Sequence, residues 1–468
     1  MKYVSFGGRL VMLGCGSIGQ GVLPLILRHI DLPRQNIHIV TADSRGSDVA
    51  AEYGVAFTVA QLTRDNYRDL LLPLLGPGDF LLNLSVDVSS VALIELCQKL
   101  GVLYLDTCIE PWAGGYTDPS LTPSQRSNYA LRESALTLAV ARQPAPTAVL
   151  THGANPGLVS HFVKQALLDI AHDTGAEPVV PASRDEWAAL AAGLGVKVIH
   201  IAERDTQSAD LAKRPGEFVN TWSIDGFTGE GCQPAELGWG THERGWPGDA
   251  CRHDFGCDAA IYLQRPGAAT RVRSWTPLEG PFHGFLITHN ESISIADYLS
   301  LRENGVIRYR PTAHYAYHPC DDAVLSLHEF AGKNWQLQNQ KRLMMREIAR
   351  GMDELGVLLM GSSRGAYWYG SRLTIEETRR LVPFNNATSL QVTAAVLGGM
   401  VWALENPQAG VIEADYLDHQ RVLEVARPYL GDVVGVYTDW TPLAGRETLF
   451  SEDVDRTDPW QFKNFRVT

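Results

Sequence analysis

The sequence predicts an α/β fold: a doubly wound parallel sheet with an inserted α+β domain. Three observations lead to this prediction. A glycine-rich loop at residues 14–19 joins a strand-like segment to a helix-like one, and short β-rich segments then alternate with helix-like segments as far as residue 150. After about residue 185 the pattern changes, and a long helix-like stretch returns only near 376–404. Strands that alternate with helices form a parallel sheet covered on both faces.

The first element is an apolar strand at 10–13, which leads into Gly14-x-Gly16-x-x-Gly19 and then into an apolar helix through residues 22–27. The first glycine permits a tight turn, the second lets the backbone approach a pyrophosphate, and the third lets the helix pack on the strand. The helix N-terminus adds unpaired N–H groups that favour anions. Together these features predict a Rossmann-type unit that binds a dinucleotide.

Further strands are expected at 37–40, 80–84, 102–106 and 147–150, with a helix at about 91–100. Polar residues follow several of these strands. Ligands of doubly wound sheets bind beyond the carboxyl ends of the strands, so we expect one crevice at this edge. The residues expected to border it are Asn83, Ser85, Thr107, Gly153, Ala154 and Asn155.

The middle of the chain has a different pattern. Between 215 and 320 there is no sustained helical period, and the short apolar runs at 261–263 and 285–287 indicate antiparallel strands. We expect this region to hold the substrate. The predicted division is a dinucleotide-binding domain at 1–155, a substrate domain at 156–385, and a C-terminal segment at 386–468 that packs back on the first domain.

The net charge and the cysteines indicate which partners, cellular location and metal content to expect. The net charge of −13 argues against a nucleic-acid partner, since phosphates require basic surfaces. Seven cysteines, an odd number without a C-x-x-C pair, indicate reduced thiols and hence a cytoplasmic protein. Cys251, His253 and Cys257 could ligate a metal, but a structural zinc site requires four ligands at tighter spacing, so no metal is expected.

No membrane segment is expected. The glycine-rich loop begins before any apolar stretch long enough for the core of a signal peptide. The longest apolar window, 392–404, is interrupted by Gly398 and Gly399 and is too short to cross a bilayer.

The end of the second strand bears on the choice of cofactor. An acidic residue about 20 positions beyond the loop ordinarily binds the adenosine ribose of NAD. Here Val40 is followed by Thr41, Asp43 comes two positions later, and Arg45 lies beyond it. Asp43 could still reach the ribose, whereas Arg45 could meet the 2′-phosphate of NADP. NAD is preferred, and NADP stays open.

Acidic and aromatic residues recur in the segments that follow the strands. Any one of these acids could be a helix cap, a turn residue or half of an ion pair, and any one tryptophan could belong to the core. As a set, carboxylates and a tryptophan near a nicotinamide suit a cationic substrate. The set includes Asp87, Glu110, Glu203, Trp222, Glu230 and Glu291.

An amine substrate would use all of these groups. An alkylammonium has a reference pKa of about 10.4, so it is protonated at neutral pH. Its α-carbon releases hydride only after the nitrogen has lost a proton, and the iminium product is still a cation. Carboxylates would bind the ammonium, a base would remove its proton, and an indole face would stabilise the delocalised cation.

Three longer segments, 201–206, 219–223 and 288–297, carry a resemblance to a known family. With the loop at 14–19 and the segment 437–442, they make the chain similar to the bacterial homospermidine synthases, relatives of the saccharopine dehydrogenases, over essentially its whole length. The resemblance implies a redox-neutral reaction. One putrescine is oxidised by bound NAD, ammonia leaves, a second putrescine forms a Schiff base, and the retained NADH reduces it. A homodimer, tightly held NAD and spermidine as a possible donor are also implied.

The resemblance assigns roles to residues. Glu203 and Asn155 would hold the inner amino group, Trp222 would offer its ring face to cationic intermediates, and Glu230 would lie midway along the substrate channel. The amine path and its entrance would be lined by Asp87, Glu110, Asn128, His289, Glu291 and Asp353. The cofactor would be bordered by Gly14, Gly16, Ser17, Ile18, Gly19, Asp43, Asn83, Ser85, Thr107, Ala154 and Pro156. Thr41 departs from the family, whose members can carry an acid at that strand end.

Two alternatives stay open. An NAD(P) dehydrogenase of the saccharopine or carboxynorspermidine type acts on substrates that carry carboxylates and needs arginine or lysine in its pocket, for which Arg204 is the main candidate. A non-catalytic NAD-binding sensor would not need Glu203, Trp222 and Glu110 together.

Overall fold

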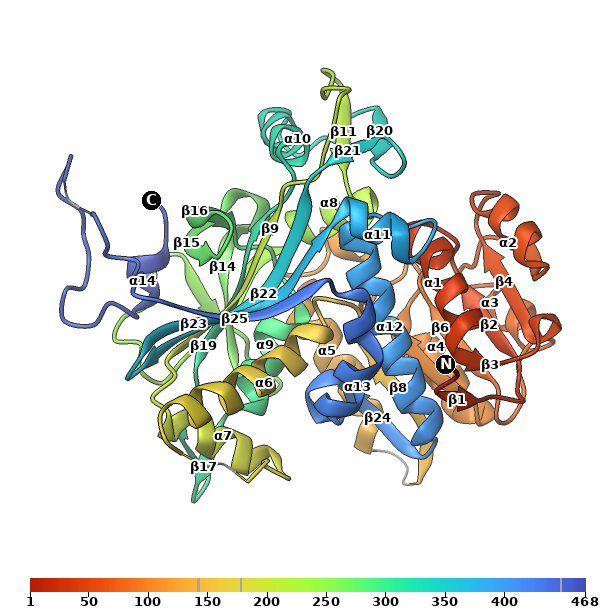
Figure 1. The fold of residues 1–468 in the computed structure, drawn as a ribbon, viewed down its shortest axis with the longest axis horizontal. Helices are drawn as coiled ribbons and strands as arrows, with labels where there is room; N and C mark the ends of the chain where they lie inside the picture. Colours follow the sequence, from red (N-terminus) through yellow and green to blue (C-terminus); the bar gives the residue numbers. More distant parts are fainter. Residues whose placement is uncertain (141–143, 177–178, 447) are drawn as a thin grey trace.

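Two sheets make up the framework of this computed structural model, and a long helix runs between them (Figure 1). The structure describes residues 1–140, 144–176, 179–446 and 448–468. The N-terminal part lies on one side of that helix and the larger mixed sheet on the other (Figure 1).

The N-terminal sheet has seven parallel strands in the order β24-β8-β7-β6-β2-β4-β5. The strand order reverses between β2 and β6, and ligands of doubly wound sheets bind at such a point. The predicted doubly wound parallel sheet is confirmed. Its strands are β2 (Leu10–Leu13), β4 (Ile37–Thr41), β5 (Ala56–Val59), β6 (Phe80–Asn83), β7 (Leu103–Asp106), β8 (Ala145–Leu150) and β24 (Ala409–Glu413).

Helices cover both faces of this sheet, because its inner strands are apolar and buried on both sides. The predicted helices after the glycine loop and near 91–100 are present. The helices of this part are α1 (Ser17–His29), α2 (Ser47–Tyr53), α3 (Tyr67–Leu71), α4 (Ser90–Leu100) and α5 (Asn128–Leu136), and a separate parallel pair is formed by β1 (Val4–Ser5) and β3 (Ile30–Asp31).

The second sheet is mixed and has ten strands. Its path runs β13-β14-β12-β19-β9-β22-β23-β25, with β15 and β16 attached beside β19. Only β9 and β19 pair in parallel among its described pairs. The strands are β9 (Val198–Asp205), β12 (Pro234–Gly238), β13 (Ala250–Arg252), β14 (Ala260–Pro266), β15 (Arg271–Thr276), β16 (Gly280–Phe285), β19 (Thr312–His318), β22 (Met352–Ser362), β23 (Gly365–Thr374) and β25 (Asp432–Thr438).

The inserted domain is α+β, as predicted, and its two helices α8 (Ile224–Cys232) and α9 (Asn290–Tyr298) lie in the region where the sequence shows no helical period. The sequence hides them for two reasons. Three glycines interrupt α8, and α9 is buried on nearly every side, so neither has the polar face that produces a helical period. The other helices of this part are α6 (Leu158–Asp173), α7 (Arg184–Gly193) and α10 (Asp321–Gly332).

Short paired strands extend from the second sheet. β10 (Ser208–Ala209) pairs with β21 (Ile348–Arg350), and β11 (Glu217–Asn220) pairs with β20 (Gln340–Leu343). These pairs and α10 form the projection at the top of Figure 1. A separate hairpin is made by β17 (Leu301–Glu303) and β18 (Val306–Tyr309).

The expected helix near 376–404 is divided in two. α11 (Ile375–Leu381) ends before Pro383. α12 (Ala387–Glu405) is preceded by its N-cap residue Asn386, whose side chain accepts from the Ser389 backbone N–H in a capping box. α12 packs against α1 on one side and reaches β22 and β23 on the other. Together with β24 it returns the chain to the first sheet, so the second sheet is an insertion.

The C-terminal segment does not stay with the first sheet throughout. α13 (His419–Ala426) packs on α12 and α6, but β25 then pairs with β23 of the mixed sheet. α14 (Phe462–Phe465) contacts β15. The expectation that all of 386–468 packs on the dinucleotide-binding domain therefore differs from the structure after α13.

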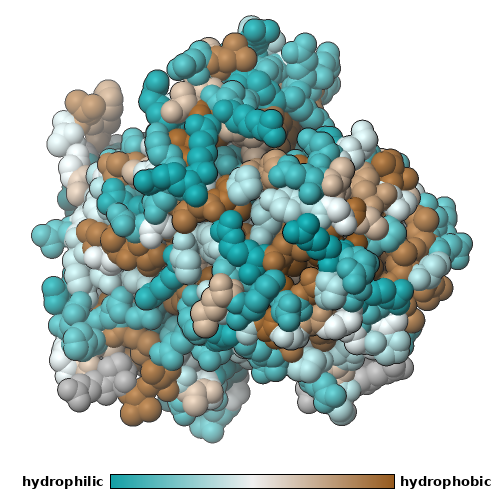
Figure 2. All heavy atoms as spheres, turned by 45° about the vertical axis from the view of Figure 1, so that its right-hand side comes forward, coloured by the Kyte–Doolittle hydropathy of each residue, from teal (hydrophilic) through white to brown (hydrophobic). Residues whose placement is uncertain are grey.

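α12 is longer than the apolar window seen in the sequence. Among the described residues it is the one helix that is long and apolar enough to cross a membrane, and 89% of its apolar window is buried inside the protein. Its apolar surface is covered by both sheets, as expected for a core helix. The face seen in Figure 2 is mostly hydrophilic, with apolar side chains scattered between polar ones.

Candidate active site

The glycine loop forms the floor of the site. Gly14 has φ +88°, and a Cβ atom there would lie 2.6 Å from the carbonyl oxygen of Leu84 at the end of β6. A Cβ atom on Gly19 would lie 2.6 Å from the Gly14 carbonyl oxygen, whereas one on Gly16 would meet nothing within 4 Å. The N-terminus of α1 has no side-chain cap. This open turn with free N–H groups fits the pyrophosphate of a dinucleotide.

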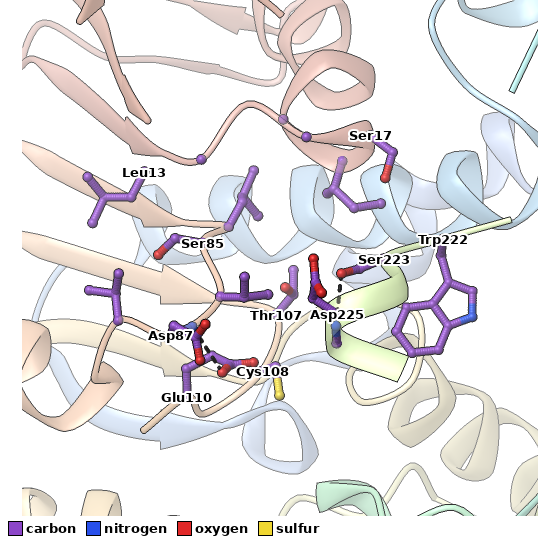
Figure 3. A pocket seen from close by; sticks show the side chains of 18 of the residues that line it. Leu13, Ser17, Ser85, Asp87, Thr107, Cys108, Glu110, Trp222, Ser223 and Asp225 are labelled. Carbon is purple, nitrogen blue, oxygen red and sulfur yellow. Dashed lines mark hydrogen bonds between the residues drawn. The ribbon is translucent and has the colours of Figure 1, made fainter. Parts of the chain in front are cut away.

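A cavity of about 850 Å³ opens at the point where the strand order reverses. It extends from the glycine loop to Glu203 on β9 and Tyr315 on β19, so both sheets contribute to its wall. In Figure 3, Asp87 and Glu110 lie on the side of the first sheet, with Trp222, Ser223 and Asp225 of the inserted domain opposite them. The predicted site residues that line it are Gly14, Gly16, Ser17, Ile18, Gly19, Asp43, Ser85, Asp87, Thr107, Glu110, Ala154, Asn155, Pro156, Glu203, Trp222, Glu230 and His289.

Glu203 is the buried carboxylate at one end of this cavity, with 2% of its surface exposed. Asn155 donates to its Oε2 over 3.0 Å, and the Tyr315 hydroxyl donates to the same oxygen. Burial raises the pKa of Glu203 to about 8, and the nearby Asp205 adds to this rise. A carboxyl group with this pKa can both hold and release a proton near neutral pH.

Glu110 and Asp87 form a second acidic group. The Asp87 backbone N–H donates to Glu110 Oε2 over 3.3 Å (Figure 3). Burial raises the pKa of Glu110 to about 8, with Glu230 and Asp87 contributing in the same direction. Burial and Asp225 also raise the pKa of Asp87. The positive charge near these clustered carboxyl groups does not balance their negative charge when they are ionised. A cationic ligand would therefore relieve their mutual repulsion.

His289 joins two more carboxylates. Its Nε2 lies 3.1 Å from Glu230 Oε2, and its Nδ1 lies 3.2 Å from Glu291 Oε1. Burial alone would lower the pKa of His289, but Glu291 and Glu230 outweigh it and raise the pKa to about 10. The imidazole is therefore a cation near neutral pH that holds Glu230 at the cavity wall.

The strand end at Thr41 brings Asp43 and Arg45 into the cavity wall as a pair. Asp43 accepts from the backbone N–H and the Nε–H of Arg45 over 2.9 and 2.8 Å. These hydrogen bonds lower the pKa of Asp43. The two candidates for contact with the ribose end of the cofactor are thus bonded to each other.

Four expected site residues do not line the cavity, although each is buried. Asn83 accepts from the Ser85 hydroxyl, and Asn128 donates through its backbone N–H to Glu236. Glu291 lies beside His289, which does line the cavity. Asp353 accepts from the hydroxyl of Thr388, which does line the cavity. These residues lie behind the wall rather than in it.

Other lining residues were not identified from the sequence as site residues: Tyr315, Thr388, Lys341 and Asp225. Segment 314–318 is dense in polar and aromatic residues, and in the structure it belongs to the buried strand β19. Its composition does not reveal that β19 lies beside β9, which is what brings Tyr315 to Glu203. Lys341 pairs with Asp225, more than 100 positions away in the chain, so no local signal marks either residue.

Arg204 does not enter the cavity. Its guanidinium lies 3.1 Å from Glu279 and 3.2 Å from Asp321, and it also donates to backbone carbonyl groups. It is absent from the described lining, where the cations are Arg45, Arg64 and Lys341 together with His289. Arg204, the candidate for binding a carboxylate substrate, is therefore paired with Glu279 and Asp321 outside the cavity.

The prediction that no metal is bound was based on the spacing of Cys251, His253 and Cys257 in the sequence. In the structure this ring stacks on Tyr129 with centroids 3.9 Å apart and bonds to Ser124. Among the described residues, no group of three or more His, Cys, Asp or Glu could hold a metal ion. The seven cysteines are free thiols.

Comparisons with known proteins agree with this geometry. Residues 10–149 match the saccharopine dehydrogenase NADP binding domain, and residues 153–437 match the saccharopine dehydrogenase C-terminal domain. The chain is 58% identical to a homospermidine synthase of Blastochloris viridis, covering 99% of this chain and 98% of that protein. The chain belongs to the homospermidine synthase family.

A second homospermidine synthase, of Mesorhizobium japonicum, is 52% identical over 99% of this chain and 97% of its own length. The crystal structure of the Legionella pneumophila homospermidine synthase in complex with NAD superposes with a TM-score of 0.93 at 51% identity, covering 99% and 98% of the two chains. The predicted family and fold class are confirmed, and the chain is an enzyme of the homospermidine synthase family with NAD as its cofactor.

Proposed function

We propose that this homospermidine synthase joins two putrescine molecules into sym-homospermidine and releases one ammonia, without net oxidation. The observation that carries the proposal is the position of Glu203, a buried carboxyl group in the same cavity as the glycine loop. When bound, NAD supplies the oxidation of an amine carbon and the later reduction of the Schiff base. The protein has to bind the amines, move their protons and exclude water.

Glu203 is the proposed site for the inner amino group. In its ionised form it pairs with the ammonium, and an opposite charge lowers its raised pKa. Because that pKa is about 8 without ligand, the carboxylate can also take the proton that must leave before the amine carbon reacts. Asn155 and Tyr315 donate to one carboxylate oxygen and leave the other, Oε1, for the substrate.

Trp222 is proposed to stabilise the cations that follow. Oxidation of the amine gives an iminium, whose charge is spread over carbon and nitrogen. An aromatic face binds such a cation by about 2 kcal/mol or more when water is excluded. A second putrescine then adds its free amine to the iminium carbon, ammonia leaves, and the resulting Schiff base remains cationic. The indole is suited to every one of these species.

Glu110, Asp87 and Glu230 are proposed to bind the distal ammonium groups. Their carboxyl groups belong to the same cavity wall, and His289 holds Glu230 in place. Burial of Glu110 keeps it protonated near neutral pH until a cation arrives. An acidic path of this kind selects amines over carboxylate substrates, since a carboxylate would be repelled and Arg204 is bound elsewhere.

The ribose end of NAD is proposed to lie at the Asp43–Arg45 pair. The carboxylate, already held by Arg45, can accept from a ribose hydroxyl group. The glycine loop receives the pyrophosphate, and Ser85, Thr107 and Ala154 border the nicotinamide end. On the side of the amine path, Asn128, Glu291 and Asp353 are proposed to support the cavity wall from behind.

One reaction mixture tests the proposal. The protein is incubated with putrescine and NAD in an amount far below that of the amine, and triamine, ammonia and NADH are followed. We expect triamine and ammonia in equal amounts without accumulation of NADH. NADH formed in proportion to the amine consumed would instead identify an ordinary dehydrogenase, and NAD binding without turnover would identify a sensor. Spermidine in place of one putrescine tests the second donor.

We also propose a homodimer and a cytoplasmic location. The homodimer rests on the family resemblance, and the cytoplasmic location on the seven free thiols. Light scattering on the purified protein measures the first, and fractionation of the source cells measures the second.

A further inference from the structure

One hydrogen bond fixes the ring of Trp222. The residue lies between β11 and α8, and its ring packs on Phe227 with centroids 5.1 Å apart. Its indole Nε1–H donates to the hydroxyl oxygen of Tyr317 over 2.9 Å. Figure 3 shows the indole nitrogen directed away from Cys108 and Glu110. An indole has a single polar atom, its N–H group. This hydrogen bond is therefore the one directional contact that can fix the rotation of the ring.

Tyr317 is itself held rigidly. It is fully buried on β19, inside the mixed sheet, where it lies opposite Glu203 of β9. Its ring stacks on that of Tyr315 with centroids 5.0 Å apart and an interplanar angle of 10°. Burial, and then the carboxylates of Glu203 and Asp205, raise the pKa of Tyr317 well above its usual value. The phenol therefore stays protonated and neutral.

The two stacked tyrosines contact two residues that are proposed to bind the amine, Glu203 and Trp222. The Tyr315 hydroxyl donates to Glu203, and the Tyr317 hydroxyl accepts from Trp222. Residues two apart on a strand point to the same face, so β19 carries both contacts on one rigid surface. The geometry thus connects the carboxylate that receives the amine with the indole that faces the cation.

We propose that Tyr317 is a positioning residue for the reaction: its hydroxyl group orients the Trp222 indole, and its stacking on Tyr315 keeps that indole in register with Glu203. This inference rests on the proposed role of Trp222. The attraction between a cation and an aromatic ring depends on the ring presenting its face. A ring free to rotate would present its edge for part of the time, and the cationic intermediates would lose stabilisation.

The test is a double-mutant cycle on NAD-loaded enzyme with Tyr317→Phe, Trp222→Phe and the double variant. Tyr317→Phe removes the hydroxyl group and keeps the stacked ring. We expect kcat to fall roughly ten-fold, with KM for putrescine and the affinity for NAD changed less than about two-fold, as for a weakened contact to a reacting cation. In the Trp222→Phe background the indole N–H is gone, so Tyr317→Phe should change kcat less than about two-fold.

The control is Tyr309→Phe, which removes the hydroxyl of a partly buried tyrosine that donates to the Val196 carbonyl and does not line the cavity. It should leave kcat unchanged. An equal loss from Tyr317→Phe in both backgrounds would overturn the proposal, because the hydroxyl would then act independently of the indole. If Trp222→Phe is too slow to measure, a crystal structure of Tyr317→Phe decides: a reoriented indole supports the proposal and an unchanged one overturns it. Wild-type enzyme without triamine formation would instead refute the proposed function.

Discussion

At the scale of single residues, the site depends on carboxyl groups whose charge is controlled by burial. Glu203 is almost completely buried, and its pKa rises to about 8 although two hydrogen bonds stabilise its ionised form. Glu110 behaves in the same way. A raised pKa means that each group is protonated without ligand at neutral pH and becomes ionised when a cation arrives.

The pH dependence of kcat/KM for putrescine tests these two groups. In the free enzyme we expect kcat/KM to rise with pH up to about 8, more steeply than for one group, because Glu203 and Glu110 both lose a proton in this range. Glu203→Gln should lower kcat/KM roughly 100- to 10,000-fold. In this variant the slope of log kcat/KM against pH should correspond to the loss of one proton. Glu110→Gln is the matched comparison: its pH slope should be the same as that of Glu203→Gln, and its decrease in kcat/KM should be smaller. A near-normal rate for Glu203→Gln would remove this residue from the mechanism.

The residues found from the sequence share one property: each lies in a recognisable local segment. Glu203 and Trp222 belong to segments 201–206 and 219–223, which carried the family resemblance. Tyr315 and Tyr317 occur in an ordinary buried strand, and their importance comes from the pairing of β19 with β9. Such a contact depends on tertiary register, which no spacing within either segment encodes.

At the scale of elements, the glycine turn between β2 and α1 is the part whose function follows most directly from local geometry. Gly14 needs its left-handed backbone and its missing side chain because β6 approaches it closely. Gly16 has ordinary backbone angles, and the space above it is open. A side chain at Gly16 would therefore meet the cofactor rather than the protein.

Gly16→Ala provides a test of this turn. The variant should fold as stably as the wild type, whereas its affinity for NAD should fall about ten-fold or more, equivalent to about 1.4 kcal/mol, because the methyl group enters the pyrophosphate position. Isothermal titration measures the affinity and thermal unfolding the stability. Gly7→Ala is the control, since a Cβ atom there also meets nothing within 4 Å. Equal NAD affinity for both variants would contradict the assignment of the turn.

Elements were predictable where they are periodic and bounded. Five of the seven parallel strands of the first sheet are apolar runs followed by polar residues, and they were predicted close to their observed bounds. The two edge strands, β5 and β24, were not predicted. The short helices α8 and α9 were missed because one is rich in glycine and the other has almost no exposed face. The division between α11 and α12 could have been placed at Pro383, since proline disfavours helix in the residue before it.

At the scale of the whole molecule, we expect the binding of a polycation to be coupled to the release of protons. The cavity brings together acids from both sheets, and its pKa values of about 8 describe the state without ligand. A diammonium ligand lowers these values by its opposite charge. Binding of a substrate that is already cationic should therefore release protons from these carboxyl groups into solution.

Calorimetry of putrescine binding to NAD-free protein measures this exchange, since no turnover occurs without the cofactor. At pH 7.5 we expect a release of between one and two protons per diamine bound, obtained from buffers with different ionisation enthalpies. Glu203→Gln should release about one proton fewer. Binding without proton release in the wild type would show that the acids are already ionised, against the raised pKa values.

Deuterium retention tests the central claim, that bound NAD takes up one hydride from an amine carbon and returns it to the Schiff base within the same turnover. Putrescine deuterated at both amine carbons is converted in the presence of excess unlabelled NADH. We predict homospermidine that keeps every deuterium atom of its two precursors, because oxidation and reduction occur without exchange of cofactor. Homospermidine that has lost one deuterium atom, or NADH that accumulates as amine is consumed, would contradict the account.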